Sequence, residues 1–287
     1  MSFTLVLSND PDHGLLSNDE KAFSALNKIG IKFTHSVFCK LEDDNSPLSK
    51  HCNIKETSSL SDPKYVNFLL KMKENGNEIA FHGYSQISNP RENFIKGLES
   101  YKDIFGEYPY TYIEHGGILG RHAEGMVKKE SLSYKGSDVN SQYYIKDIVE
   151  SKFKCVWERK GGLFDEGEPD WTVKKTSDVL NFENDVAKIK RHRMANLDRE
   201  SYLKDLSEKK GIYMGYTHFG FRGYEARLNK SFFNIPIFFK DNYLDCYHGK
   251  YRIERAVKRL EEIRNKYSFE SMTIKEFVKR TKQNKSI

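Results

Sequence analysis

The sequence has no long hydrophobic run. Its mean hydropathy is −0.71, and no apolar stretch approaches the roughly 18 residues that a membrane-spanning helix requires. We therefore expect no membrane span. The N-terminus also lacks a basic segment followed by a long apolar stretch and small residues, the pattern of a secretory signal. A cytoplasmic location is the expectation that follows.

Cysteine is scarce, with four residues and no C-x-x-C pair. Without an export signal these thiols are expected to be reduced and structural. Charges of both signs are spread along the chain, so the net charge of +6 does not predict nucleic-acid binding and suits an acidic or phosphorylated sugar equally well. With no repeat, low-complexity segment or linker, we expect one domain over residues 1–287. The sequence leaves open whether the chain forms a homo-oligomer.

Strand-like and helix-like segments alternate through the first 120 residues. The apolar runs predict strands at 3–8, 31–38, 77–82 and 108–115, and the helical patterns fall at 17–30, 63–76 and 90–106. Ser17 and Glu20 have capping-box spacing at the start of the first helix. This alternation is typical of a parallel sheet or barrel with helices between its strands.

The pattern is weaker after Gly120. Residues 143–153 favour a helix and 154–160 a strand, and residues 183–211 predict one or two helices. A strand at 212–219 and a helix at 251–267 follow, the latter with apolar residues along one side.

Polar side chains follow several of the predicted strands. The carboxyl ends of parallel strands meet at one rim, so these side chains should lie together. Carboxylate and imidazole groups suit zinc and other divalent metals, and a nearby carboxylate can take a proton from metal-activated water. The residues concerned are Asp10, Asp12, His82, Glu114, His115 and His218. Each alone also has a structural interpretation: "DPDHG" is an ordinary turn sequence, and a single histidine is commonly hydrogen-bonded core.

Three segments resemble polysaccharide deacetylases of carbohydrate esterase family 4. "NEIAFHGYSQ" resembles the family's E-I-G-x-H-x-x-S/T-H segment, "FSALNKIGIKFTHSVF" its first helix and second strand, and "FIKGLESYKDIFGEYPY" its following helix. "SMTIKEFVKR" resembles its terminal strand and helix. The resemblance implies an α/β fold, a distorted (β/α) barrel of the glycoside hydrolase/deacetylase type. It also implies a divalent metal, zinc in most members, that serves to hydrolyse N- or O-acetyl groups on sugars.

The resemblance also implies roles for individual residues. Asp10 matches the catalytic base and Asp12 the metal-binding aspartate, in a D-x-D form, while His82 matches the first metal histidine. His218, in "IYMGYTH", matches the histidine that acts as general acid. "EPDW" matches a fourth motif loosely, with Asp170 and Trp171 at the expected place in chain order.

The sequence departs from the family at two motifs. Gln86 stands where the second metal histidine is expected, and an amide oxygen is a weaker zinc ligand than imidazole. "YIEHGG" stands where an arginine-proline motif is expected. His115 or Glu114 could complete the metal set, or Glu114 could orient a ligand. Tyr216, beside His218, could stack on a sugar or pack in the core.

The hypothesis that these residues support is metal-dependent removal of an acetyl group from an intracellular saccharide or polysaccharide precursor. Two alternatives stay open. One is a barrel with altered or lost chemistry that binds carbohydrate. The other is an amide or glycoside hydrolase that uses Asp10, Glu114 and Asp170 without a metal. The sequence identifies neither the saccharide nor the metal.

Overall fold

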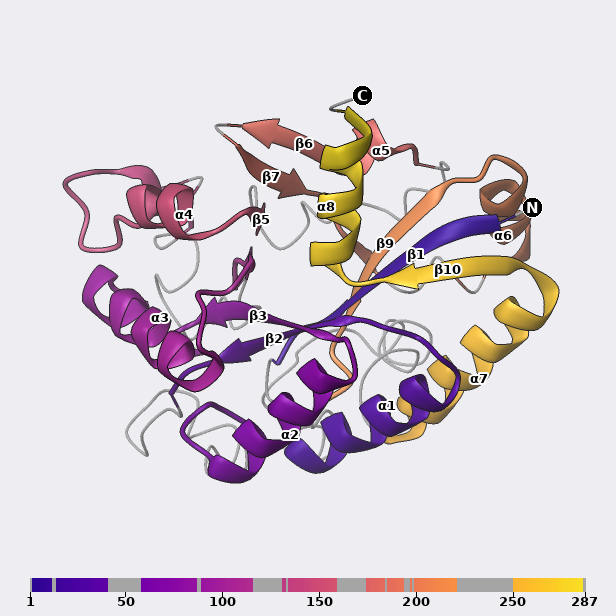
Figure 1. The fold of residues 1–287 in the computed structure, drawn as a ribbon, viewed down its shortest axis with the longest axis horizontal. Coiled ribbons are helices and arrows are strands. Elements are labelled where there is room, and N and C mark those ends of the chain that lie inside the picture. Colours follow the sequence, from indigo (N-terminus) through magenta and orange to yellow (C-terminus); the bar gives the residue numbers. More distant parts are fainter. Residues whose placement is uncertain are drawn as a thin grey trace, which may run out of the picture.

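The structure is a computed structural model that describes most of the chain. Its first and last strands lie next to each other and pair. The residues described are 2–11, 14–40, 58–86, 89–115, 131–132, 134–158, 174–183, 185–193, 197, 199–220 and 250–285. Within them ten strands form one sheet in the order β6-β7-β5-β4-β3-β2-β1-β9-β8, with β10 beside β1 (Figure 1). Their bounds are β1 Ser2–Asn9, β2 Thr34–Phe38, β3 Glu78–Gly83, β4 Thr111–Ile113, β5 Cys155–Trp157, β6 Leu180–Glu183, β7 Val186–Ile189, β8 His192–Arg193, β9 Ile212–Thr217 and β10 Ser268–Met272.

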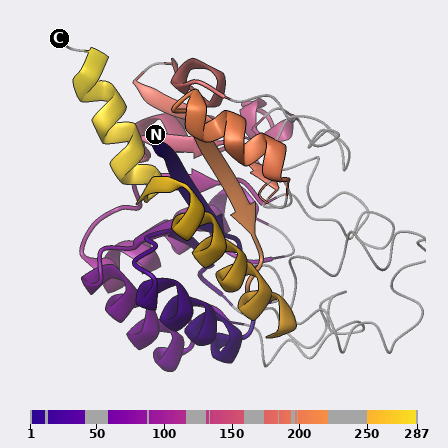
Figure 2. The ribbon, with the colours of Figure 1, turned by 90° about the vertical axis from the view of Figure 1, so that its right-hand side faces the viewer.

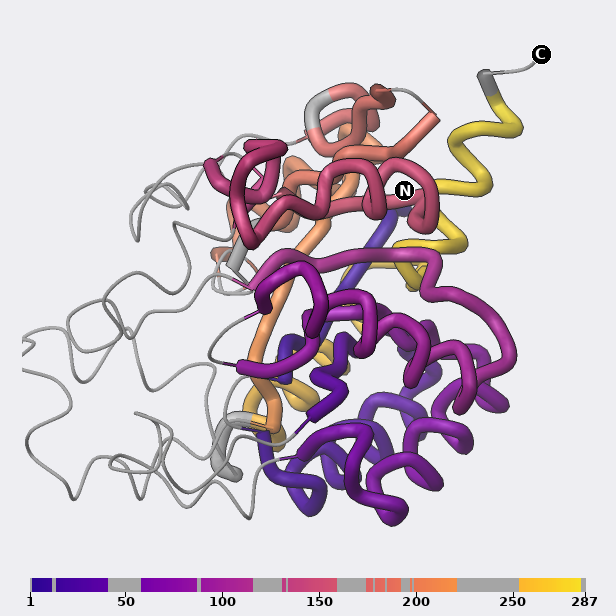
Figure 3. The backbone as a smooth tube through the Cα atoms, turned by 90° about the vertical axis from the view of Figure 1, so that its left-hand side faces the viewer, coloured from indigo at the N-terminus to yellow at the C-terminus, as the bar shows by residue number. Residues whose placement is uncertain are grey.

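Helices cover the outside of this sheet. They are α1 Leu16–Lys28, α2 Pro63–Glu74, α3 Arg91–Phe105, α4 Lys146–Lys152, α5 Thr176–Val179, α6 Glu200–Glu208, α7 Lys250–Lys266 and α8 Ile274–Lys285, with a short 3-10 turn at Lys135–Ser137. Helix α1 contacts both α2 and α7 (Figure 2), whereas the end of α8 extends away from the other helices (Figure 3). No helix in the described parts of the chain is long and apolar enough to cross a membrane.

A short segment of chain brings the two sides of the curved sheet together, without a strand pairing between them in the described part of the chain. Strand β7 pairs with β5, and β8, only two residues further on, pairs with β9. The residues between them, Lys190 and Arg191, therefore join the two ends of the strand order. All of these pairings are parallel, as are those of β1 with β2 and β9. The distorted (β/α) barrel expected from the sequence is confirmed.

The distortion lies beside β1. Its first residues pair with β10, from Ser2 against Ser268 to Val6 against Met272, and only Ser8 and Asn9 reach β2. Strand β10 thus separates β1 from β2 at one end of the barrel. The buried carboxylate of Glu78 accepts hydrogen bonds there from Thr34 and Thr111 (2.8 and 2.6 Å) and from the backbone N–H of Lys275 (2.7 Å). Glu78 thereby fixes the first turn of α8, where backbone N–H groups lack helical partners.

The predicted early elements are confirmed within a few residues, but two details were wrong. Helix α1 has Leu15 as its N-cap with no side-chain cap, so the Ser17–Glu20 capping box does not form. Instead the Leu15 N–H donates to the carbonyl of Gly220 (2.9 Å). Of the segment 183–211, expected to contain one or two helices, the later part forms α6, but its first residues form the end of β6 and all of β7 and β8, strands that the sequence did not predict.

The core has two layers separated by the strands. Large aromatic side chains such as Phe81, Phe94 and Phe153 fill the space between the sheet and the helices. A second cluster, inside the barrel, is built from smaller residues at alternate strand positions, among them Val6, Ala80, Ile113, Cys155, Ala187 and Met214. Side chains at every second position of a strand share one face. Counting on in steps of two from these buried residues therefore identifies the side chains that point into the barrel at the carboxyl ends of the strands.

Candidate active site at the carboxyl ends of the strands

The inward-facing rows of the barrel end in polar side chains. On β1 the row runs from Val6 through Ser8 to Asp10, and on β9 from Met214 through Tyr216 to His218. Alternation along the other strands ends similarly, at His82 after Ala80, at His115 after Ile113, and at Arg191 after Ala187 and Ile189. Local strand geometry thus brings carboxylate, imidazole and guanidinium groups from five segments to one end of the barrel.

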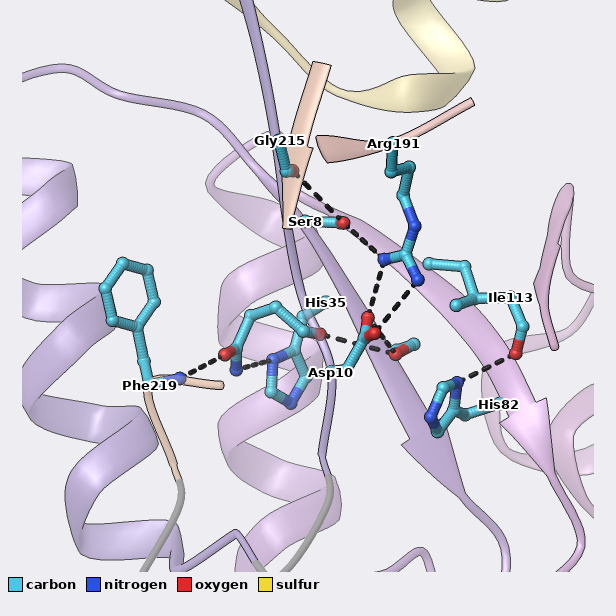
Figure 4. Close-up of polar contacts among 10 residues, drawn as sticks. Ser8, Asp10, His35, His82, Ile113, Arg191, Gly215 and Phe219 are labelled. Atoms are coloured by element: carbon cyan, nitrogen blue, oxygen red, sulfur yellow. Dashed lines mark hydrogen bonds and ion pairs between the residues drawn. The ribbon is translucent and has the colours of Figure 1, made fainter. Parts of the chain in front are cut away.

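Asp10 and Arg191 form a buried bidentate ion pair (Figure 4). The Nη1 and Nη2 atoms of Arg191 donate to Oδ1 and Oδ2 of Asp10 at 2.7 and 2.9 Å. Nη1 also donates to the hydroxyl of Ser8 (2.6 Å), and that hydroxyl donates to the carbonyl of Gly215 (3.4 Å). Two parallel N–H bonds fix the plane of the carboxylate as well as its position.

Two aromatic rings enclose the guanidinium group of Arg191. Its central carbon lies 4.1 Å from the ring centroid of Trp157 and 4.9 Å from that of Tyr216. Such contacts favour a cation that has lost its water. The ring of Tyr216, expected to stack on a sugar, is 6% exposed and contacts Arg191, so its neighbours here are protein groups.

The electrostatic surroundings keep Asp10 ionised. Burial raises the pKa of its carboxyl group, but the charge and hydrogen bonds of Arg191, together with the two nearby imidazoles, outweigh burial and hold that pKa below its usual range. The charges of His82 and His218 act on Asp10 in the same direction. Both imidazoles predicted to take part in the chemistry therefore lie close enough to Asp10 to stabilise its negative charge.

A backbone carbonyl orients the imidazole of His82. Its Nδ1 lies 2.8 Å from the carbonyl oxygen of Ile113, and because a carbonyl only accepts, Nδ1 carries a proton; when the ring is neutral, its lone pair is on Nε2. The ring of His115 lies 5.1 Å from that of His82, and Phe38 packs against both at 5.2 and 4.9 Å. A histidine whose other nitrogen is held by a carbonyl is typical of metal ligands.

The described residues supply only part of a metal site. Among them no group of three or more histidine, cysteine, aspartate or glutamate side chains could hold an ion. Asp12, predicted as the carboxylate ligand, lies outside the described residues, as do Asp170 and Trp171. The fit to a divalent metal therefore rests on the two neighbouring imidazoles and on the orientation of His82.

The remaining predicted residues lie in the turns after β3 and β4. Glu114 is buried, and its Oε1 accepts the backbone N–H of Leu132 (2.6 Å), which anchors a distant segment to the rim. Gln86 is buried in the turn after β3. In that turn Asn89 accepts the backbone N–H of Ser85 (3.0 Å). His218 is half-buried, with its ring 5.8 Å from that of Tyr216.

The sequence analysis missed Arg191 and Ser8. The available signal was the alternation of Ala187, Ile189 and Arg191, which puts the arginine on the same face as two buried apolar residues. That signal depends on recognising a strand where the charge pattern of "KIKRHR" favours an exposed helix.

These observations define a distorted, mostly parallel barrel with a charged site at the carboxyl ends of its strands. No family model matches the sequence, and no curated protein matches it. Several solved structures are similar to the chain, among them the following three. The peptidoglycan deacetylase PdaC from Bacillus subtilis is 10% identical, with 99% of this chain and 94% of that chain covered and a TM-score of 0.43.

The other two are equally remote in sequence. A PuuE allantoinase is 11% identical, with 91% of this chain and 90% of that chain covered and a TM-score of 0.39. A probable polysaccharide deacetylase from Pseudomonas aeruginosa is 11% identical, with 91% of each chain covered and a TM-score of 0.38.

Proposed function

We propose that the chain is a metal-dependent hydrolase that removes an acetyl group from a saccharide. The observation that carries the proposal is the position of Asp10. It is an ionised carboxylate at the carboxyl ends of the barrel strands, oriented by Arg191 and within the electrostatic reach of His82 and His218. The motif resemblance supplies the reaction class.

We assign a divalent metal, zinc in the first instance, to Asp12, His82 and His115, with Gln86 as an alternative ligand. When bound, such a metal polarises a carbonyl group and lowers the pKa of water. The lone pair on Nε2 of His82 supports this assignment, because the Ile113 carbonyl keeps the proton on the other nitrogen.

The chain's own residues account for the proton movements. Oδ1 of Asp10 accepts from Arg191 and from the Ser36 hydroxyl (3.4 Å), whereas Oδ2 accepts from Arg191 and has a second acceptor position, so Asp10 can still accept a proton from the attacking water through Oδ2. His218 then protonates the leaving group. Glu114, Asp170, Trp171 and Tyr216 remain proposed substrate-binding residues.

The substrate that we propose is an intracellular saccharide, such as a nucleotide sugar or a lipid-linked precursor of a surface polysaccharide. The net charge of +6 supports a substrate that is acidic or phosphorylated.

Metal uptake tests the proposal directly. Protein stripped with a chelator and titrated with zinc, cobalt or nickel should bind about one ion per chain. Asp12→Ala and His82→Gln should each weaken uptake by at least about 100-fold, because each removes a ligand. Asp103→Ala, which removes an exposed carboxylate on α3, should leave uptake unchanged.

Acetate release from a panel of N- and O-acetylated sugars completes the test. Release that depends on the added metal supports the proposal. No metal uptake at any concentration contradicts it. In that case binding of the sugars without turnover would favour a carbohydrate-binding barrel, and metal-free turnover would favour an amide or glycoside hydrolase.

A further inference from the structure

A buried asparagine joins the two strand ends that carry Asp10 and His218. Asn9 is 0% exposed and, as the neighbour of Asp10, points to the opposite side of β1, toward the helices. Its Oδ1 accepts the backbone N–H of Phe219 (2.6 Å), directly after His218 (Figure 4). Its Nδ2 lies 3.1 Å from Oδ1 of Asp19 in α1 and 2.8 Å from Nδ1 of His35 in β2.

Backbone chemistry fixes the direction of every hydrogen bond in this group. The Phe219 N–H can only donate, so the oxygen of the Asn9 amide faces it and the NH2 group faces Asp19 and His35. Nδ1 of His35 must then accept, which leaves the ring proton on Nε2, 2.6 Å from the hydroxyl of Tyr65. Burial, which lowers the pKa of His35 to about 3, keeps this ring neutral.

The turn after His218 is also fastened to the start of α1. The carbonyl of Gly220 accepts from the Leu15 N–H (2.9 Å) and from Nδ2 of Asn18 (3.3 Å). A Cβ atom at Gly220 would lie 2.6 Å from Oδ1 of Asp19, so the turn can approach the carboxyl group this closely only because the residue is glycine. Asn9 and α1 therefore hold the same turn from two directions.

We propose that Asn9 is a positioning residue that fixes the distance between Asp10 and His218. The inference rests on the proposed hydrolysis, in which these two residues move the protons. Arg191 fixes the carboxylate of Asp10 from inside the barrel. From outside the barrel, Asn9 holds together the two backbone segments that carry Asp10 and His218. A displacement of about 1 Å at a reacting group can cost about 100-fold in rate.

The test compares two buried asparagines. Asn9→Leu removes the bridge. Asn77→Leu is the matched control, because Asn77 is also buried and also holds backbone groups, accepting from the Phe33 N–H (3.0 Å) and donating to the Met72 carbonyl (3.2 Å), but at the other end of the strands. We expect Asn9→Leu to lower kcat about 10- to 100-fold with KM and metal affinity unchanged, because binding groups stay in place. Asn77→Leu should keep the wild-type kcat in its folded fraction.

An unchanged kcat in Asn9→Leu, or an equal loss in Asn77→Leu, overturns the proposal. If Asn9→Leu does not fold, Asn9→Ala decides: it adds no bulk and removes the side-chain oxygen that accepts the Phe219 N–H. A lowered kcat at unchanged KM in that variant supports the proposal, and the wild-type kcat contradicts it.

A second readout separates this inference from the proposed function. The Phe219 amide should exchange with solvent about tenfold faster in Asn9→Leu than in Asn77→Leu, and the nitrogen NMR signals of His35 should lose their fixed Nε2–H pattern. If wild-type protein releases no acetate, the proposed function fails. The Phe219 exchange rate and the His35 signals still test whether Asn9 holds the turn after His218. A change of both in Asn9→Leu supports that role of Asn9. Wild-type exchange together with wild-type His35 signals overturns it.

Discussion

Arg191→Met should lower the free energy of unfolding by about 3–5 kcal/mol, because it leaves the carboxylate of Asp10 buried without its partner. The side chains of Arg191 and Asp10 are 0% and 5% exposed, so water cannot replace the two lost N–H donors. The guanidinium also packs between Trp157 and Tyr216, and the unbranched methionine side chain retains part of that contact. Urea denaturation at neutral pH measures the effect.

Adding Asp10→Asn to this variant separates the charge from the packing. The double variant should regain most of the lost stability, since it contains no unpaired buried charge. It should release no acetate, and neither should Asp10→Asn alone, because both lack the group that accepts the proton. If Arg191→Met loses less than about 1 kcal/mol, within the range of ordinary substitutions, the pair is not the buried charge pair described here.

Asp19→Asn should stabilise the protein at alkaline pH by up to about 4 kcal/mol. Burial raises the pKa of Asp19 from 3.8 to about 7, although the hydrogen bond from Asn9 opposes the shift. The folded state therefore keeps a proton that the unfolded chain loses at lower pH. The resulting stability is fully present below about pH 4 and is lost as pH rises to about 7. Within the described residues Oδ2 of Asp19 has no hydrogen-bond partner, so ionisation brings no compensating contact there.

His35 contributes in the opposite sense. Burial lowers its pKa from 6.5 to about 3, so the unfolded chain binds a proton that the folded state refuses, and stability is lost as pH falls below about 6.5. Between about pH 4 and 6.5, a rise in pH lowers the contribution of Asp19 to the free energy of unfolding and raises that of His35. In Asp19→Asn, of these two contributions only that of His35 remains.

The measurement is the difference in unfolding free energy between Asp19→Asn and wild type at several pH values. We expect it to be small at pH 4 and to grow steadily toward pH 8. Asp103→Asn, an exposed aspartate on α3, is the control and should show no such trend. A difference that is the same at pH 4 and pH 8 would mean that Asp19 ionises normally in the folded state.

The sequence was sufficient where local pattern decides the structure. A buried strand must be followed by a turn, and at the carboxyl end of a parallel strand that turn lies on the rim, so the location of Asp10, His82 and His218 followed from the strand predictions alone. The early helices were also recognised from their apolar faces. Their exact starts were not, because a backbone contact from the distant Gly220 replaces the expected cap at Leu15.

The sequence was insufficient where partners come from distant segments. Arg191 is buried because Asp10 and Ser8 from β1, Trp157 from β5 and Tyr216 from β9 surround it. No window of sequence around an arginine contains that information. The strands β7 and β8 were not predicted for the same reason, since they have two to four residues each and are stabilised by ladders to opposite ends of the sheet.

The insertion of β10 between β1 and β2 has a consequence during synthesis. Residues 2–6 leave the ribosome long before their partners at 268–272, which lie far along the chain. For that interval one side of β1 is an open edge, which other strands can pair with. Contacts of such long sequence separation also form slowly. A nascent chain of this protein should therefore depend on chaperones more than its size suggests, until its closing strand has emerged.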